Sequence, residues 1–169
     1  SALAEATTRV TLGPLVLNVA NRPAGVLANM AATLQEASGG RLLVGLGAGG
    51  SRATPYAAEQ DAIGRPVGSD TERRHELERA IERIRALWAG DPPGFLRPSP
   101  APPTVVGGFG PRMAAIAGRW ADGFNTPARH PQLAELIGMA RDAHAKAGRD
   151  PARFLVTVFA GLADGWLGA

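Results

Sequence analysis

Residues 40–50 read GRLLVGLGAGG, an apolar run that ends in closely spaced glycines. Gly45, Gly47 and Gly50 satisfy the spacing G-x-G-x-x-G, which in dinucleotide-binding proteins lets the backbone approach a pyrophosphate. That motif must open a helix at once, because the N-terminus of the helix carries the phosphate. The residues after Gly50 include Pro55 and have no amphipathic period. A dinucleotide site is therefore disfavoured, and the glycines must serve another close approach of the backbone.

A second glycine cluster has a better setting for an anion. Residues 105–113 read VVGGFGPRM, in which an apolar run leads through glycines to Pro111. Proline is favoured in the first turn of a helix, where free N–H groups and the helix dipole attract negative charge. Arg112 adds a cation in that turn. The pattern fits a phosphate held by backbone N–H groups, and it also fits glycines that only let a strand turn into a helix.

Apolar strands alternate with amphipathic helices along the chain, without a repeat of fixed length. The predicted strands are residues 10–19, 42–46, 104–106, 124–126 and 154–159. The predicted helices begin at Pro23, near Ser69 or Asp70, at Pro111 and near Leu133, and residues 51–69 are predicted to form a loop. This order implies an α/β fold with about five parallel strands, either doubly wound or a (β/α) barrel.

Two of these helices carry clear apolar stripes. The first stripe consists of Val26, Leu27, Met30, Ala31 and Leu34. The second consists of Leu77, Ile81, Ile84, Leu87 and Trp88. Each stripe is predicted to face a protein core.

Ligands of parallel α/β folds bind beyond the carboxyl ends of the strands. The residues at those positions are Asn18 with Asn21, residues 47–52, residues 107–112, Asn125 with Thr126, and residues 159–161. Most of them are small or polar, which suits a backbone that approaches a ligand closely. Among the histidines, His130 lies near these ends at a helix start, whereas His75 and His144 are predicted to lie on the surface of helices.

Composition excludes several classes of function. The hydrophobic fraction of 45% and the charged fraction of 20% are typical of a globular protein, here predicted to be one domain over residues 1–169. The chain has no cysteine, so disulfides and thiolate sites are excluded, and no metal site is expected. A net charge of +3, with basic and acidic residues interspersed, does not favour nucleic acid. Because no run is long and apolar enough for a membrane helix or a signal sequence, the expected location is the cytoplasm.

Three stretches of the chain together resemble the bacterial luciferase-like monooxygenases, a family of flavin- or coenzyme F420-dependent oxidoreductases. They are TTRVTLGPLVLNVANRPAGVLANMAATLQEASGGRLLVGLGAGG, ERAIERIRALWAG and PPTVVGGFGPRMAAIAGRWADGFNT. The resemblance covers residues 2–162 and implies a TIM-barrel fold with the cofactor, F420 or FMN, across the carboxyl ends of the strands. It places Asn18 where the family bends its backbone against the cofactor ring, often through a non-proline cis peptide. It also places residues 47–50 after the fourth strand and residues 107–112 in the phosphate-contacting turn.

The predicted cofactor-binding residues share these strand ends. They are Asn18, Gly47, Gly49, Gly50, Gly107, Gly108, Gly110, Arg112 and Asn125. No catalytic residue is assigned, because family barrels have eight strands and this chain matches the third to the seventh. The fold is therefore expected to be an incomplete TIM-barrel-like (β/α) domain with exposed sheet edges. Either another subunit covers these edges in a homo-oligomer, or the chain is a fragment.

The resemblance implies an oxidoreductase or monooxygenase that acts on an unknown small organic substrate. The alternative is a truncated, non-catalytic barrel remnant that binds a phosphate ligand or assembles with other subunits. Neither alternative involves nucleic acid or a membrane.

Overall fold

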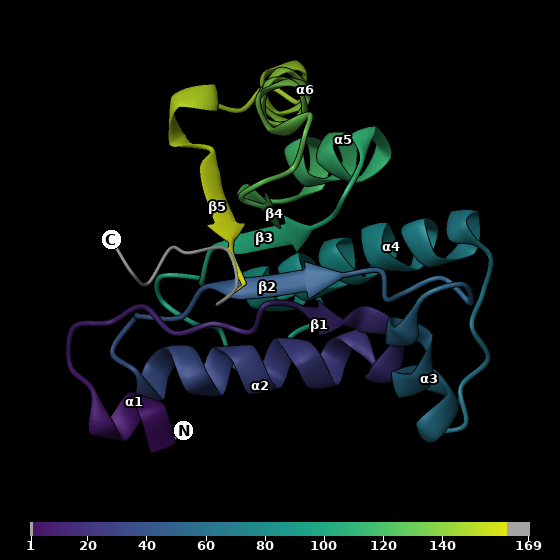
Figure 1. Ribbon diagram of the computed structural model, residues 1–169. Helices are drawn as coiled ribbons and strands as arrows, with labels where there is room; N and C mark the ends of the chain where they lie inside the picture. The colour runs from purple at the N-terminus through teal and green to yellow at the C-terminus, as the bar shows by residue number, and fades with distance from the viewer. Residues whose placement is uncertain (1, 162–169) are drawn as a thin grey trace. The chain divides into compact units, whose positions relative to one another are not determined.

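The computed structural model describes residues 2–161 (Figure 1). The chain divides into two compact units, Ser1–Thr104 and Val105–Ala169, which are described separately.

The first unit contains two paired strands and four helices. Its elements are α1 (Ala2–Ala6), β1 (Leu17–Asn18), α2 (Ala24–Ala37), β2 (Val44–Gly47), α3 (Ala58–Ala62) and α4 (Asp70–Ala89), with 3-10 turns at Val19–Asn21 and Pro55–Ala57. Strands β1 and β2 are parallel, with Leu17 opposite Leu46 and Asn18 opposite Gly47. Helix α3 lies beyond the carboxyl ends of these strands (Figure 1).

Helix α4 forms because its ends are capped and one of its faces is apolar. The Ser69 side chain accepts the Glu72 N–H while the Glu72 carboxylate accepts the Ser69 N–H, and Gly90 ends the helix in the left-handed conformation with φ of 94°. The predicted stripe from Leu77 to Trp88 is buried. Helix α4 packs against α2, where the Trp88 indole donates to the Ala28 carbonyl at 3.0 Å. The predicted core role of this stripe is confirmed.

The predicted stripe on α2 is only partly buried: Leu27 is buried, and Ala31 and Leu34 are half-buried. Val26 and Met30 are 46% and 53% exposed. The buried residues of this helix are Leu27, Ala28, Ala32 and Gln35. Gln35 is buried because its amide is satisfied on both sides: it donates to the Pro100 carbonyl and accepts the Leu42 N–H. The buried face of this helix therefore consists of one leucine, two alanines and one satisfied amide, and the hydrophobic stripe does not reveal the alanines or the amide.

Two further expectations for the first unit are corrected. The predicted strand over residues 10–19 is a strand only at Leu17–Asn18, with an isolated bridge between Leu12 and Leu42. Pro14 interrupts the run, because proline cannot donate to a strand ladder. The predicted loop over residues 51–69 contains α3, whose Gln60 is 1% exposed.

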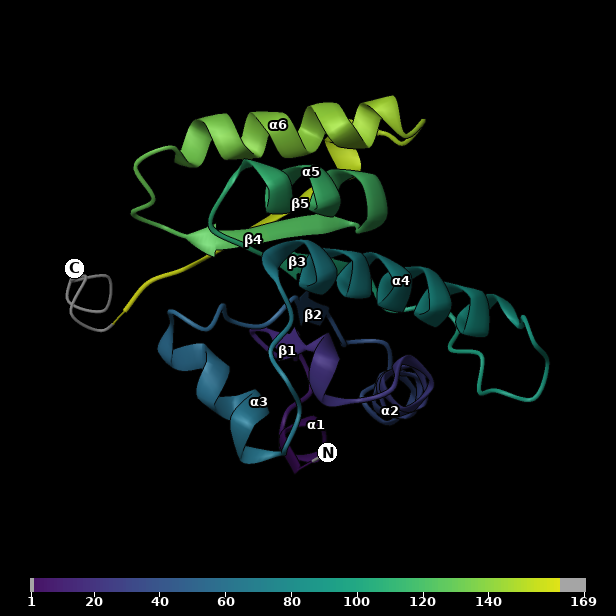
Figure 2. The ribbon, with the colours of Figure 1, turned by 90° about the vertical axis from the view of Figure 1, so that its right-hand side faces the viewer.

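The second unit places two helices on one side of its strands (Figure 2). Its elements are β3 (Thr104–Gly107), which begins at the last residue of the first unit, α5 (Pro111–Trp120), β4 (Gly123–Pro127), α6 (Leu133–Lys146), a 3-10 turn at Pro151–Arg153 and β5 (Leu155–Phe159). Strand β4 pairs in parallel with both β3 and β5. Helices α5 and α6 meet at Gly118, where an added Cβ would lie 2.1 Å from the Ala140 carbonyl oxygen.

His144 belongs to the core of this second unit, so its predicted surface position is wrong. The residue is 4% exposed, its Nδ1 lies 3.0 Å from the Gly118 carbonyl oxygen, and its ring packs on Phe154. The free backbone carbonyl of a glycine gives the ring a partner inside the unit, and this satisfies a polar group that would otherwise be costly to bury.

The five strands alternate with helices, and they are parallel wherever they pair within a unit. The predicted α/β class with about five parallel strands is therefore confirmed.

Candidate functional site

The turn after β2 packs against the end of β1. Asn18 is 7% exposed and lies opposite Gly47 in the parallel register. Its Oδ1 accepts the Ala20 N–H at 3.0 Å, and its Nδ2 donates to Oε1 of Gln60 at 3.2 Å. The amide of Gln60 in turn reaches the Pro66 carbonyl at 3.4 Å. Both the oxygen and the nitrogen of the Asn18 side chain therefore bond within the protein, and they join β1 to α3.

The glycines of this turn are required by contacts within the chain. A Cβ on Gly49 would lie 2.5 Å from Nδ2 of Asn18, and one on Gly47 would lie 2.7 Å from Cγ2 of Val16. A Cβ on Gly50 would meet Thr54 Oγ1 at 2.5 Å. The close approach predicted for this turn therefore exists, but the backbone approaches the protein's own side chains.

A buried arginine holds the other side of the turn. Arg73 on α4 is 8% exposed, and its Nη1 donates to the carbonyl oxygens of Gly49 and, at 3.4 Å, of Ala48. Its Nη2 forms an ion pair with Oδ1 of Asp70 at 2.6 Å. The turn is thus fixed between Asn18 and Arg73.

A non-proline cis peptide joins Leu15 and Val16. The resemblance predicts such a bond at Asn18, which instead has extended backbone with φ −72° and ψ 115° and caps the 3-10 turn that follows. The bend therefore lies upstream of the predicted residue.

The second glycine turn, after β3, is tied to β4. Gly107 lies opposite Asn125 in the register, and the Gly108 N–H donates to the Asn125 carbonyl at 3.0 Å. A Cβ on Gly108 would lie 2.3 Å from Cβ of Met113, so this glycine allows α5 to pack closely on the turn. Asn125 is 2% exposed, and its amide donates to Oγ1 of Thr157 on β5 at 2.8 Å.

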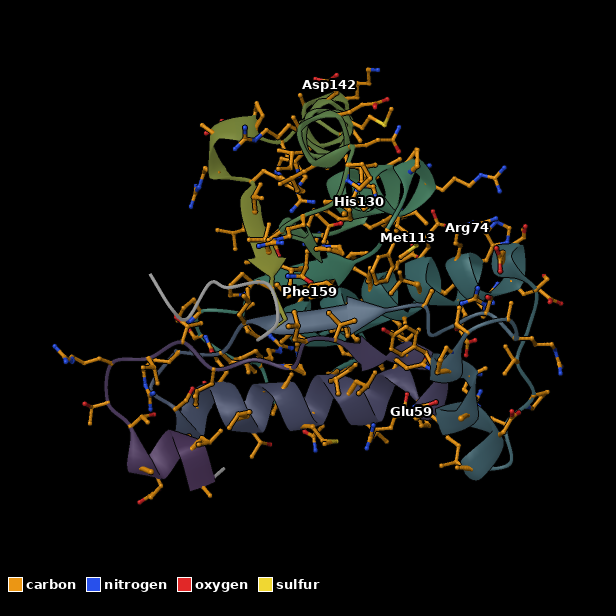
Figure 3. The ribbon with its side chains drawn as sticks, in the orientation of Figure 1. Glu59, Arg74, Met113, His130, Asp142 and Phe159 are labelled. Carbon is orange, nitrogen blue, oxygen red and sulfur yellow. The ribbon has the colours of Figure 1, made fainter. Side chains whose placement is uncertain are left out.

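The start of α5 is open, in contrast to these packed glycines. Gly110 is the N-cap residue, its extended backbone carries no side-chain cap, and a Cβ there would meet nothing within 4 Å. Arg112 is exposed in the first turn. It also lines a groove of about 420 Å³ with Asp142 and Lys146 of α6, and Figure 3 shows Asp142 on the side of α6 that faces away from the strands. The open helix start can accept an anion, and Arg112 is near enough in sequence to contribute charge.

An aromatic pair lies near this helix start. The rings of Phe109 and Phe159 pack edge to face with centroids 6.2 Å apart. Nδ1 of His130 accepts the Gln132 N–H at 3.1 Å, so Nε2 carries the proton and donates to the Phe109 carbonyl at 3.0 Å. His130 and Phe159 extend from the ends of β4 and β5 (Figure 3). The predicted role of His130 at a helix start agrees with its bond to Gln132, the N-cap residue of α6.

Sequence reasoning missed Gln60 and Arg73. The sequence could have indicated Arg73, because this residue lies one helical turn before Leu77 and so places a charge on the apolar face of α4. For Gln60 the sequence has no such indication, since its role depends on where α3 folds over β1.

Over residues 2–161, no group of three or more acidic, histidine or cysteine side chains could hold a metal ion. In the same range no helix has the length and apolar character needed to cross a membrane.

Known proteins resemble this chain in sequence and in fold. The model of a family described as luciferase-like monooxygenase matches residues 1–163. An F420-dependent glucose-6-phosphate dehydrogenase from Microbacterium testaceum is 32% identical over 165 residues, which cover 88% of this chain and 47% of the relative. An F420-dependent hydroxymycolic acid dehydrogenase from Mycobacterium tuberculosis is 34% identical over 133 residues, covering 71% of this chain and 35% of the relative.

Solved structures of other proteins have a similar fold. An F420-dependent secondary alcohol dehydrogenase in complex with an F420–acetone adduct superposes with a TM-score of 0.81 at 25% identity, over 93% of this chain and 51% of that one. The coenzyme F420-dependent tetrahydromethanopterin reductase from Methanopyrus kandleri gives 0.75 at 23% identity, over 94% and 52%. The chain covers between 35% and 52% of the length of these relatives and structures, in keeping with the predicted incomplete barrel-like fold. The match over nearly the whole sequence shows that this chain belongs to the luciferase-like monooxygenase family.

Proposed function

We propose that this chain contributes the cofactor site of an oxidoreductase that uses coenzyme F420, with FMN as the alternative cofactor, on a small organic substrate. The observation that carries the proposal is the open N-terminus of α5 at Gly110, directly after a strand end, in a chain of this family. Pro111 has no N–H, and those of Met113 and Ala114 bond to the Gly110 carbonyl, so the backbone N–H of the first turn left for a phosphate is that of Arg112. Both cofactors contain a phosphate.

The residues present fit such a group in two different ways. Gly110 and Arg112 offer accessible backbone and a cation. The other proposed cofactor-binding residues are taken unit by unit. In the first unit Asn18 ends β1, and Gly47, Gly49 and Gly50 lie at or just after the end of β2. In the second unit Gly107 and Gly108 lie at or just after the end of β3, and Asn125 lies within β4. Each set would meet a bound cofactor mainly with backbone. Because the side chains of Asn18 and Asn125 bond within the protein, we assign them to shaping the wall and not to direct side-chain contact with the cofactor.

Bound F420 or FMN would supply the hydride or electron transfer. The task of this chain's own residues is to bind and orient the cofactor and to exclude water from it. The aromatic pair Phe109 and Phe159 suits the exclusion of water, because Phe109 is 59% exposed and apolar near the helix start.

The names of the relatives support F420 over FMN, since the curated relatives described above are F420-dependent. Their names give glucose-6-phosphate and hydroxymycolic acid, so they support no single substrate for this chain. The expected single domain over residues 1–169, the homo-oligomer and the cytoplasmic location stay predictions. The alternative of a non-catalytic remnant gains no support from the contacts described above.

An anaerobic equilibrium titration of the purified chain with F420 and with FMN, followed by cofactor fluorescence, tests the proposal. We expect saturable binding of F420 that Arg112→Ala weakens. Arg141→Ala, an exposed arginine on α6, is the matched control and should bind as the wild type does. A folded wild-type chain that binds neither cofactor contradicts the proposal, and preferred binding of FMN changes the cofactor assigned.

A further inference from the structure

Arg73 is a cation on the apolar face of α4, one turn before the buried Leu77. Burying a charge is costly unless it is paired and hydrogen-bonded. Arg73 is paired with Asp70, and its remaining bonds go to the carbonyls of Ala48 and Gly49. The partners that keep this charge inside the protein are therefore the Asp70 carboxylate and two backbone oxygens of the glycine turn.

These bonds fix the direction of the turn's N–H groups. The peptide bonds on both sides of Gly49 are trans, and in a trans peptide the N–H points opposite to the carbonyl. Holding the carbonyls of Ala48 and Gly49 toward Arg73 therefore directs the N–H groups of Gly49 and Gly50 away from α4. With Gly49 at φ +73°, successive N–H groups that point the same way form a concave site for an acceptor or an anion.

We propose that Arg73 is a positioning residue, which orients the N–H groups of Gly49 and Gly50 to receive an acceptor oxygen of the cofactor. The inference rests on the proposed function, because it deepens the role of the same turn. Arg73 itself does not touch the cofactor. Its Nε is buried and lacks a hydrogen-bond partner among the described residues, so the Nη groups alone determine how the guanidinium holds the turn.

Lysine cannot reproduce this arrangement. The planar guanidinium reaches a carboxylate and two carbonyls at once, whereas a single ammonium has one centre from which to donate. Arg73→Lys is therefore expected to hold one carbonyl and to leave the other free. Arg73→Met keeps the apolar stem and removes every donor.

The test compares these variants with Arg79→Met, an exposed arginine on the same helix. Two quantities are measured on the full chain: the amide NMR resonances of Gly49 and Gly50 without cofactor, and the Kd for F420 and for FMN. We expect Arg73→Met to move both resonances and to raise the Kd by about tenfold, the share of one hydrogen bond. In Arg73→Lys the resonance shifts and the Kd should lie between those of the wild type and Arg73→Met. In Arg79→Met both should equal those of the wild type.

A merely structural role would lower the melting temperature and leave the Kd of the folded variant unchanged, which overturns the proposal. If Arg73→Met does not fold, the test rests on Arg73→Lys. Wild-type resonances of Gly49 and Gly50 together with a wild-type Kd in that variant would then overturn the proposal. If the wild type binds neither cofactor, the proposed function fails by itself. In that case moved resonances of Gly49 and Gly50 would still support the orienting role of Arg73, and unmoved ones would remove it.

Discussion

The Cβ position of Gly49 lies 2.5 Å from Nδ2 of Asn18, so the turn after β2 has no room for a side chain there. Gly49 also has φ of +73°, a region that strongly favours glycine. Sterics and backbone conformation thus act on the same residue. Gly64 offers a comparison, because its φ is +70° but a Cβ there would meet nothing within 4 Å.

Replacing Gly49 with alanine is expected to destabilise the protein more than replacing Gly64. Gly64→Ala is expected to lower the free energy of unfolding by about 1 kcal/mol, because only the left-handed backbone disfavours a side chain there. Gly49→Ala adds the displacement of Asn18, whose overpacking costs roughly 1 to 3 kcal/mol more. Urea denaturation of both variants measures the difference. Equal losses would show that Asn18 moves aside without cost.

Two glycines of the second unit are expected to respond to alanine with opposite signs. A Cβ on Gly118 would lie 2.1 Å from the Ala140 carbonyl oxygen and 2.7 Å from Cβ of Ala143, so Gly118→Ala must separate α5 from α6. We expect a loss of roughly 1 to 3 kcal/mol. Gly138 on α6 meets nothing within 4 Å, so Gly138→Ala should stabilise the helix by up to about 1 kcal/mol.

Thermal unfolding of both variants, followed by circular dichroism, compares them directly. If Gly118→Ala kept the wild-type melting temperature, the helices would not meet as closely as described.

The sequence was sufficient to predict a helix and its buried face where the end signals and the apolar stripe agree with the burial in the structure. The predicted start of helix α4 near Ser69 or Asp70 is confirmed with Ser69 as its N-cap, and its predicted apolar stripe is buried. On α2 the apolar pattern was misleading, because Val26 and Met30 face outward while Gln35 is buried through its bonds to Pro100 and Leu42. The periodicity of a helix shows which residues share a face, but not which face is covered.

In the candidate site, too, the sequence indicated which residues are in close contact but not what they contact. Glycines mark a close approach of the backbone, and the structure has close contacts at Gly47, Gly49 and Gly108. Their partners come from elsewhere in the chain: Val16, Asn18 and Met113. Arg73 and Gln60 complete the surroundings of the first turn through long-range contacts, which a single sequence does not specify.

Arg41 is expected to hold the start of the chain in place. Its guanidinium donates to the carbonyls of Ala4, Thr7 and Val10 and to the Thr7 hydroxyl, at distances of 2.8 to 3.0 Å. Arg41→Met removes all of these donors at once, which should loosen residues 2–10 while α4 stays folded. Trypsin should then cleave after the exposed Arg9 faster than in the wild type.

Arg52→Met is the control for this experiment, because it removes a different, exposed arginine in the loop after β2. Cleavage after Arg9 at the wild-type rate in Arg41→Met would show that these bonds do not limit the opening of the segment.

The capping box of α4 is expected to make its contribution to stability depend on pH. Hydrogen bonds from the Ser69 hydroxyl and then from the Ser69 N–H lower the pKa of Glu72 from its ordinary value of 4.5. A carboxylate with a lowered pKa in the folded state stabilises the protein above the unfolded value, and this contribution is lost as the pH falls below 4.5 through the folded pKa. Glu72→Gln should therefore remove part of the acid-induced loss of stability.

Urea unfolding at pH 7 and at pH 3 tests this expectation, with Glu82→Gln as the control on the same helix. Ser69→Ala should cost about 1 kcal/mol at pH 7, where the box is intact. At pH 3 the same substitution should cost less, because the protonated Glu72 no longer holds the box closed with its charge. A cost of Ser69→Ala that is the same at both pH values would mean that the Glu72 charge contributes nothing through this cap, and that the hydroxyl of Ser69 acts on the Glu72 N–H alone.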